Sequence, residues 1–96
     1  MADLIWTKQA LSDVENITEY IAKDSNYYAK TFVEKIFTSV TRLEVFPESG
    51  RVVPELNDLC IREIILGNYR IIYRVNSKIV EILTVYHSAR LLDMGN

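Results

Sequence analysis

The sequence has few of the residues on which several classes of protein depend. Its 96 residues include one cysteine, one histidine, two prolines and three glycines. The lone Cys60 cannot form an intrachain disulfide, no apolar run approaches the ~18 residues of a membrane span, and the N-terminus lacks a signal-peptide pattern. We therefore expect a cytoplasmic protein without a membrane partner. One histidine and one cysteine also give no cluster with zinc-like spacing, so we expect no metal and no other cofactor.

Length and charge limit the function further. Ninety-six residues correspond to about one domain, and 49% apolar residues suffice for a core, so residues 1–96 are predicted to form a single domain. Eleven Lys and Arg residues against thirteen Asp and Glu residues give a net charge of -2. No global positive field therefore draws the chain to phosphate, and we expect no sequence-specific DNA binding by this chain alone.

The first half of the chain shows helical periodicity after one short strand at residues 3–7. Thr7 is a suitable N-cap for a helix over 8–22, whose apolar stripe is Leu11, Val14, Ile17 and Ile21. A second helix follows the turn residues 24–26 and should end near Val45, with the stripe Ala29, Phe32, Val33, Ile36, Phe37, Val40 and Leu43. The short connection predicts an antiparallel helical hairpin.

The second half has the pattern of strands. Residues 47–58 show no clear period and include Pro54, so they should form an irregular connection. Gly67-Asn68 and Asn76-Ser77 are hairpin signals between segments rich in Ile, Val and Tyr, which predicts strands near 60–66, 69–75 and 78–87. The expected fold is α+β with two layers, in the order β-α-α-β-β-β, with an antiparallel sheet packed on the helical hairpin.

Alternation of side chains along these strands predicts two different sheet faces. The face expected to pack on the helices holds Arg62, Ile64, Leu66, Tyr69, Ile71, Tyr73, Val75, Val80, Ile82, Thr84 and Tyr86. The other face mixes charged and apolar residues, namely Ile61, Glu63, Ile65, Arg70, Ile72, Arg74, Ile79, Glu81, Leu83, Val85 and His87. An open face of this kind is typical of a binding surface.

Several short motifs, in their order and spacing, resemble those of one protein family. They are Trp6 with Ala10-Leu11 and Asp13, Tyr20-Ile21-Ala22, residues 46–51 (Phe-Pro-Glu-Ser-Gly-Arg), Pro54-Glu55, Arg62-Glu63, residues 69–73 (Tyr-Arg-Ile-Ile-Tyr), and Val85-Tyr86-His87 ahead of Arg90. Together they cover nearly the whole chain and resemble the RelE/ParE superfamily of toxins from type II toxin-antitoxin pairs. The resemblance implies a toxin that is neutralised by a cognate antitoxin and works through the open sheet face.

The superfamily includes at least two activities. RelE-like members cut mRNA on the translating ribosome, whereas ParE-like members inhibit growth by poisoning DNA gyrase. The long helical hairpin and the turn at 47–51 resemble the ParE-like plasmid-stabilisation branch more closely. Because a ribosome ligand must approach a dense phosphate surface, the net negative charge also favours the gyrase hypothesis. A ribosome-dependent mRNA endoribonuclease is the alternative.

The resemblance and the strand pattern together suggest site residues. In an endoribonuclease, Arg70, Arg90 and His87 would surround the scissile phosphate and Glu63 would act as base. The structural alternative for Arg70 is a ladder of ion pairs in which Glu63 and Glu81 neutralise Arg70 and Arg74. His87 could equally be a hydrogen-bonding residue at the end of a strand.

The antitoxin is expected on the open sheet face and in the groove beside the helices. A segment that folds on docking would insert its apolar anchors between Ile65, Ile72 and Leu83. Arg70 and Arg74 lie on the same predicted face and complete the expected antitoxin-binding set.

Overall fold

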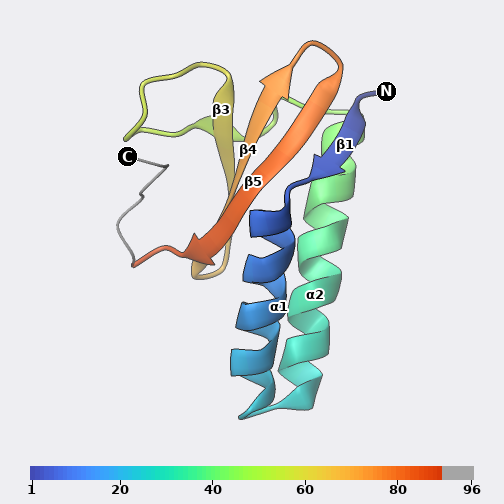
Figure 1. Ribbon diagram of the computed structural model, residues 1–96, viewed down its shortest axis with the longest axis vertical. Helices are drawn as coiled ribbons and strands as arrows, with labels where there is room; N and C mark the ends of the chain where they lie inside the picture. The colour runs from blue at the N-terminus through green and yellow to red at the C-terminus, as the bar shows by residue number, and fades with distance from the viewer. Residues whose placement is uncertain (90–96) are drawn as a thin grey trace.

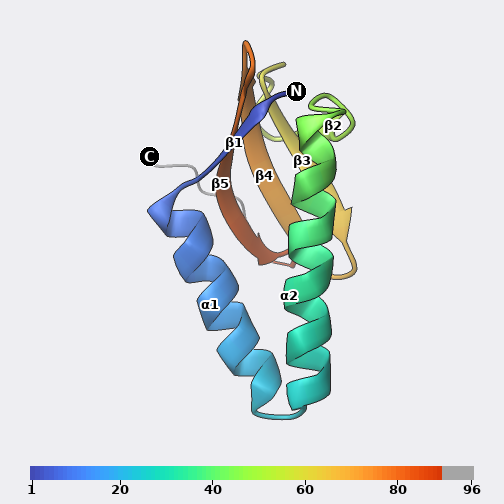
Figure 2. The ribbon, with the colours of Figure 1, turned by 90° about the vertical axis from the view of Figure 1, so that its right-hand side faces the viewer.

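The protein has two layers, a helical hairpin and a five-stranded sheet, as a computed structural model of residues 1–89 shows (Figures 1 and 2). The elements in chain order are β1 (Asp3–Trp6), α1 (Lys8–Ala22), α2 (Asn26–Thr41), the 3-10 helix η1 (Arg42–Glu44), β2 (Arg51–Val52), β3 (Ile61–Leu66), β4 (Tyr69–Asn76) and β5 (Ile79–His87). The predicted α+β class is confirmed, and so is the predicted order with one addition, the two-residue strand β2 within the connection 47–58 that was expected to be irregular. Within the described range, no helix is both long and apolar enough to cross a membrane.

Side-chain caps fix where the two helices begin. Thr7 Oγ1 accepts a hydrogen bond from the Ala10 amide at 3.1 Å and donates one to the Ile82 carbonyl at 2.7 Å, which ties the start of α1 to β5. Ser25 Oγ accepts from the Tyr28 amide at 3.1 Å and caps α2. The helix over 8–22 is therefore confirmed at both ends, and the second helix continues through η1 to Glu44, close to its predicted end.

The sheet has the strand order β1-β5-β4-β3-β2. The turns between β3, β4 and β5 are tight, and Gly67 adopts a φ of 58° in the first of them, a conformation that glycine tolerates without strain. The edge strand β1 pairs with β5 in parallel, so the sheet is mixed and not wholly antiparallel. At the opposite edge, the two residues of β2 pair only with Arg62 and Glu63 of β3.

The core lies between the helical hairpin and the inner face of the sheet, and Figure 2 shows these two layers side by side. Its fully buried members include Ala10, Ile36, Val40, Leu43, Ile71, Tyr73, Val80 and Ile82. Leu11 and Phe37 were placed on the buried stripes, but 48% and 42% of their surfaces are exposed. The true stripe of α1 is centred on Ala10 and Val14, which rotates Leu11 toward solvent.

A β-bulge in β5 reverses the predicted faces at the end of that strand. Ile72 pairs with Thr84 but its neighbour Tyr73 pairs with Ile82, so Leu83 is an extra residue in β5. One extra residue moves every later side chain to the opposite face. Val85 therefore lies in the inner core, and Tyr86 lies on the outer face, opposite to their predicted positions.

Candidate functional site

The outer face of the sheet is partly covered by the chain itself. After β2 the backbone folds over the sheet, and the Val53 amide donates to the Ile61 carbonyl at 3.2 Å. An outer apolar cluster results from Val53, Ile61, Ile72 and Tyr86, with Leu56 and Leu83 packed against it. Ile72 is fully buried, so the expectation that this residue lies open to an antitoxin is wrong. The irregular segment 53–60 carried no periodic signal that would have predicted this cover.

Beside this cluster lies an ion cluster of Arg51, Glu55, Glu63 and Arg70. Arg70 Nε donates to Glu63 Oε1 at 2.5 Å, and its two terminal nitrogens donate to the two Glu55 oxygens at 2.7 and 2.9 Å. The other Glu63 oxygen accepts from Arg51 Nε. The Glu63 and Arg70 side chains are buried, whereas Glu55 reaches them from the covering segment. Two positive and two negative charges give a cluster with no net charge.

Hydrogen bonding within the ion cluster shifts its titration. The Arg70 guanidinium lowers the pKa of Glu55 from 4.5 to about 2, because it binds only the ionised carboxylate well. The same hydrogen bonds that Arg70 donates to Glu55, together with those it donates to Glu63, raise the pKa of Arg70. Arg70 also lies 5.4 Å from the centre of the Tyr86 ring, whose own pKa is raised by burial. Arg70 is thus surrounded by partners from its own chain.

The turn at 47–51 is held against the sheet by buried contacts. The Gly50 amide donates to the Tyr73 hydroxyl at 2.9 Å, and Arg62 donates to the Gly50 carbonyl at 2.9 Å. A Cβ atom at this glycine would lie 2.5 Å from the Glu63 carbonyl oxygen, so no larger residue fits without movement of the backbone. This motif therefore has a structural explanation, since the turn delivers Arg51 to the ion cluster.

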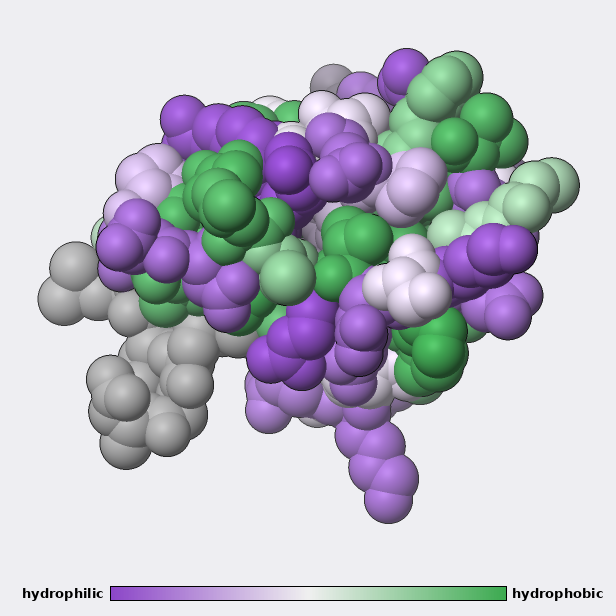
Figure 3. All heavy atoms as spheres, turned by 90° about the horizontal axis from the view of Figure 1, so that it is seen from above, coloured by the Kyte–Doolittle hydropathy of each residue, from purple (hydrophilic) through white to green (hydrophobic). Residues whose placement is uncertain are grey.

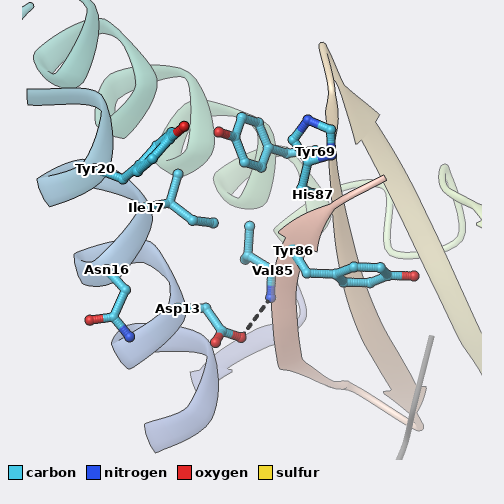
Figure 4. Close-up of a pocket in the computed structure, with 8 residues that line it drawn as sticks. All are labelled: Asp13, Asn16, Ile17, Tyr20, Tyr69, Val85, Tyr86 and His87. Atoms are coloured by element: carbon cyan, nitrogen blue, oxygen red, sulfur yellow. Dashed lines mark hydrogen bonds between the residues drawn. The ribbon is translucent and has the colours of Figure 1, made fainter. Parts of the chain in front are cut away.

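On the inner side, a groove lies between α1 and the end of β5 (Figure 4). We call it the Asp13 groove; its volume is about 440 Å³ and it is lined by Asp13, Asn16, Ile17, Tyr20, Tyr69, Val85, Tyr86 and His87. His87 lies at its rim with its ring 5.4 Å from that of Tyr69, and its Nδ1 accepts from the Ala89 amide at 3.1 Å. The groove is open to solvent, and its lining combines polar and apolar side chains.

Of the predicted catalytic residues that the structure describes, Arg70 and Glu63 come together but His87 does not join them. Arg70 and Glu63 meet in the ion cluster on the outer face, whereas His87 contacts Tyr69 on the helix side of the sheet. The sheet therefore separates the histidine from the arginine, and the bulge in β5 is the cause. Arg90 lies outside the described residues.

The structure shows the predicted ion-pair ladder in both of its steps. Arg70 binds Glu63, and Arg74 binds Glu81 at 3.1 Å on the more exposed part of the same face. Sequence reasoning missed Glu55 as the second partner of Arg70. Its signal was present in the Pro54-Glu55 motif, but a residue in an irregular segment has no register from which a contact can be predicted.

Three residues of the predicted antitoxin-binding set remain accessible. Ile65 is 49% exposed on β3, Arg74 is exposed, and Leu83 is half-buried. Viewed from the end opposite the α1–α2 connection, apolar side chains form separate patches among polar ones, with no continuous apolar face (Figure 3). The three accessible residues therefore lie around segment 53–60 and do not form one open apolar face.

Comparison with known families matches almost the whole chain. The sequence model of a family described as the ParE toxin of a type II toxin-antitoxin system, parDE, matches residues 4–92. A protein named Toxin RelE2 from Caulobacter vibrioides is 34% identical over 92 residues, covering 95% of this chain and 100% of that protein. A putative toxin, Y4kP, from Sinorhizobium fredii is 39% identical over 85 residues, covering 86% and 84% of the two chains.

Solved structures of similar fold come from toxin-antitoxin systems. A chain of the chromosomal ParDE system from P. aeruginosa superimposes with a TM-score of 0.74 at 24% identity, covering 91% of this chain and 96% of that one. A chain of the RelBE2 toxin-antitoxin complex from Mycobacterium tuberculosis gives a TM-score of 0.56 at 22% identity, covering 90% and 96%. At these identities the two structures support the fold.

Proposed function

Since this chain belongs to the ParE toxin family of type II toxin-antitoxin systems, we propose that it inhibits growth by binding DNA gyrase and does not itself cut RNA. It is a toxin component that a cognate antitoxin neutralises, and the two solved structures described above come from toxin-antitoxin systems. We place its action in the cytoplasm, where the proposed target is found.

The ion cluster is the observation that supports this choice most strongly. An RNA-cutting site needs basic groups that are free to stabilise charge on the phosphate in the transition state. Here the Arg70 guanidinium already binds two carboxylates, and Glu63, the proposed base, is buried between two arginines. A phosphate would have to displace Glu55 and pull the covering segment from the sheet. The net charge of -2 adds no long-range attraction to compensate.

The alternative remains a ribosome-dependent mRNA endoribonuclease. One observation favours it, namely the name RelE2 of the Caulobacter relative at 34% identity. Such an enzyme would have to use a set of residues other than the one predicted, or reorganise the outer face when it binds the ribosome.

Purified toxin tests the proposal with a DNA supercoiling assay. We expect wild-type toxin to inhibit gyrase-dependent supercoiling or to accumulate broken DNA, and we expect added antitoxin to reverse the effect. Full gyrase activity in the presence of a folded toxin that still arrests growth would refute the gyrase proposal. It would leave the family assignment unchanged.

For the antitoxin we propose the open edge of β3 as one docking site. Beyond Glu63, β2 no longer pairs with β3, so within residues 1–89 the outer edge of the strand has no neighbour at Ile65. A recess of about 340 Å³ lies beside this edge, lined in part by Ser39, Arg42 and Arg51. An extended segment could add there as a further strand, with an apolar side chain on Ile65 and acidic side chains toward the arginines.

An Ile65→Asp variant tests this docking site. Because Ile65 is exposed, the variant should fold, and we expect its affinity for the antitoxin to fall at least about tenfold. Lys78→Asp, in the turn between β4 and β5, makes a larger change of charge away from this edge and is the control that should bind normally. Equal affinities of the two folded variants would exclude the β3 edge.

A further inference from the structure

Asp13 on α1 lies at the base of the groove, and within residues 1–89 it has no cationic partner. Its Oδ2 accepts from Thr84 Oγ1 at 2.5 Å and from the Val85 amide at 3.1 Å, and its Oδ1 accepts from Gln9 Nε2 at 2.8 Å. All three donors are neutral. Of the five ion pairs found within residues 1–89, none includes Asp13. The hydrogen bonds from Thr84 and Val85, which we call the clamp, tie Asp13 to the bulge in β5, and no cationic group of residues 1–89 compensates its charge.

The walls of the groove are suited to a cation. The other ionisable side chains that face it are Tyr20, Tyr69 and His87, and none is positively charged when the imidazole is neutral, whereas the ring of Tyr86 points to the outer face. In Figure 4 the rings of Tyr20 and Tyr69 lie on opposite sides of the groove above Ile17, with His87 beside Tyr69. Tyr20 is 68% exposed, although its ring is large and apolar. Aromatic faces near a carboxylate attract a cation and gain little from an anion.

We propose that the Asp13 groove binds an arginine side chain of the antitoxin. This inference rests on the proposed function only in taking the antitoxin as the partner. A carboxylate has about four lone-pair positions, and three are occupied at Asp13, so one remains on Oδ1 for a guanidinium N–H. Asp13 and Tyr20 lie seven residues apart on α1, about 10 Å, so the aliphatic part of the arginine side chain would lie past Ile17 between the rings of Tyr20 and Tyr69 while its guanidinium binds Asp13. Arginine fits better than lysine because its planar fork of donors matches a carboxylate and it loses less hydration.

An Asp13→Asn variant tests the charge without removing the clamp. The amide oxygen of asparagine can still accept from Val85 and Thr84, so the bulge should persist, and slow hydrogen exchange at the Val85 amide would verify it. We expect the affinity for purified antitoxin to fall at least about tenfold, because a desolvated charge loses its partner. Glu15→Gln, an equal change of charge at an exposed position of the same helix, should bind like the wild type.

A second variant removes the aromatic wall and leaves the clamp intact. Because Tyr20 is exposed, Tyr20→Ala should keep the fold, and we expect the affinity for the antitoxin to fall several-fold. The partner residue is then identified by replacing each antitoxin arginine and lysine with glutamine in turn. One arginine should show no further loss when combined with Asp13→Asn, as a double-mutant cycle requires of interacting residues.

Three results would overturn the inference. The first is wild-type affinity of a folded Asp13→Asn variant. The second is the absence of any antitoxin arginine coupled to Asp13. The third is coupling of Asp13 to Arg90 of this chain. In that case, replacing either residue would lower the stability of the toxin alone by the same amount, and replacing both would lower it no further. Failure of wild-type toxin to bind the antitoxin at all would instead refute the proposed pairing.

Discussion

The two faces of the sheet are stabilised in different ways. The inner face buries apolar side chains against the helices, and its central residues Ile71, Tyr73, Val80 and Ile82 have no exposed surface. The outer face combines a small apolar cluster with the four-membered ion cluster under residues 53–60. Apolar packing is non-directional and tolerates one poor contact, whereas a buried ion cluster must be satisfied as a unit. Charged residues on a sheet face are therefore weak evidence of catalysis until their partners are known.

The largest expected effect comes from a charge within the outer apolar cluster. Ile72→Asp places a carboxylate among Val53, Ile61 and Tyr86, and the neighbouring Arg70 is already bound by Glu55 and Glu63. We expect a loss of more than about 4 kcal/mol, enough to unfold a domain of this size. The measurement is thermal unfolding followed by circular dichroism. A cooperative transition within a few degrees of the wild type would show that segment 53–60 does not cover the sheet in solution.

Removal of Glu63 should break the ion cluster from its centre. Glu63→Ala leaves Arg70 with Glu55 alone and frees Arg51, so a buried positive charge loses half of its compensation. We expect a cost of about 3–5 kcal/mol in the free energy of unfolding, measured by urea denaturation. The matched control is Glu81→Ala in the exposed pair with Arg74, which should cost less than about 1 kcal/mol. Similar costs for both would mean that burial is unimportant to the cluster.

A substitution that creates a cavity beneath α2 tests the packing of the helices on the inner face. Ile36 is fully buried, so Ile36→Ala should cost about 2–5 kcal/mol. Lys35→Ala, one residue earlier on the exposed side, should change stability by less than about 0.5 kcal/mol. Both values come from the same denaturation series. An equal effect of the two changes would contradict the phase of the helix.

The smallest expected effect is the loss of stability at acid pH when Glu55, which pairs with Arg70 from segment 53–60, becomes protonated. The pKa of Glu55 is about 2 in the folded protein and 4.5 in the unfolded chain, so its stabilisation is complete above pH 4.5 and disappears as the pH falls toward 2. Because the Glu55 side chain is 46% exposed, solvent screening limits the effect to about 1 kcal/mol.

The Glu55→Gln variant isolates this contribution. It should be less stable than the wild type at pH 7, and the two stability curves should converge near pH 2. Curves that stay parallel from pH 7 to pH 2 would show that Glu55 does not hold Arg70 as a carboxylate.

Local signals predicted most of the architecture. Thr7 and Ser25 are capping residues, and Gly67-Asn68 closes a two-residue turn; each acts on its immediate neighbours and can be recognised without knowledge of the rest of the fold. The parallel pairing of β1 with β5 joins residues more than 70 positions apart, and no local pattern encodes it.

The site was predicted only in part, and the failures have two physical causes. The bulge at Leu83 adds one residue to an otherwise regular alternation, which moved His87 away from Arg70. The cover over Ile72 comes from an irregular segment without a period. The pairs Arg70–Glu63 and Arg74–Glu81 were predictable because they depend on register across adjacent strands within the regular part of the sheet.

The most direct test of the central claim, that the charged outer face is structural and not catalytic, is a map of mRNA ends in a translating extract. Wild-type toxin and Arg70→Ala would be compared, with the fold of each verified by circular dichroism. The account predicts no new mRNA ends with wild-type toxin, because Arg70 is already bound by Glu55 and Glu63. Codon-phased cuts that disappear in a folded Arg70→Ala variant would contradict it and would make this toxin an endoribonuclease.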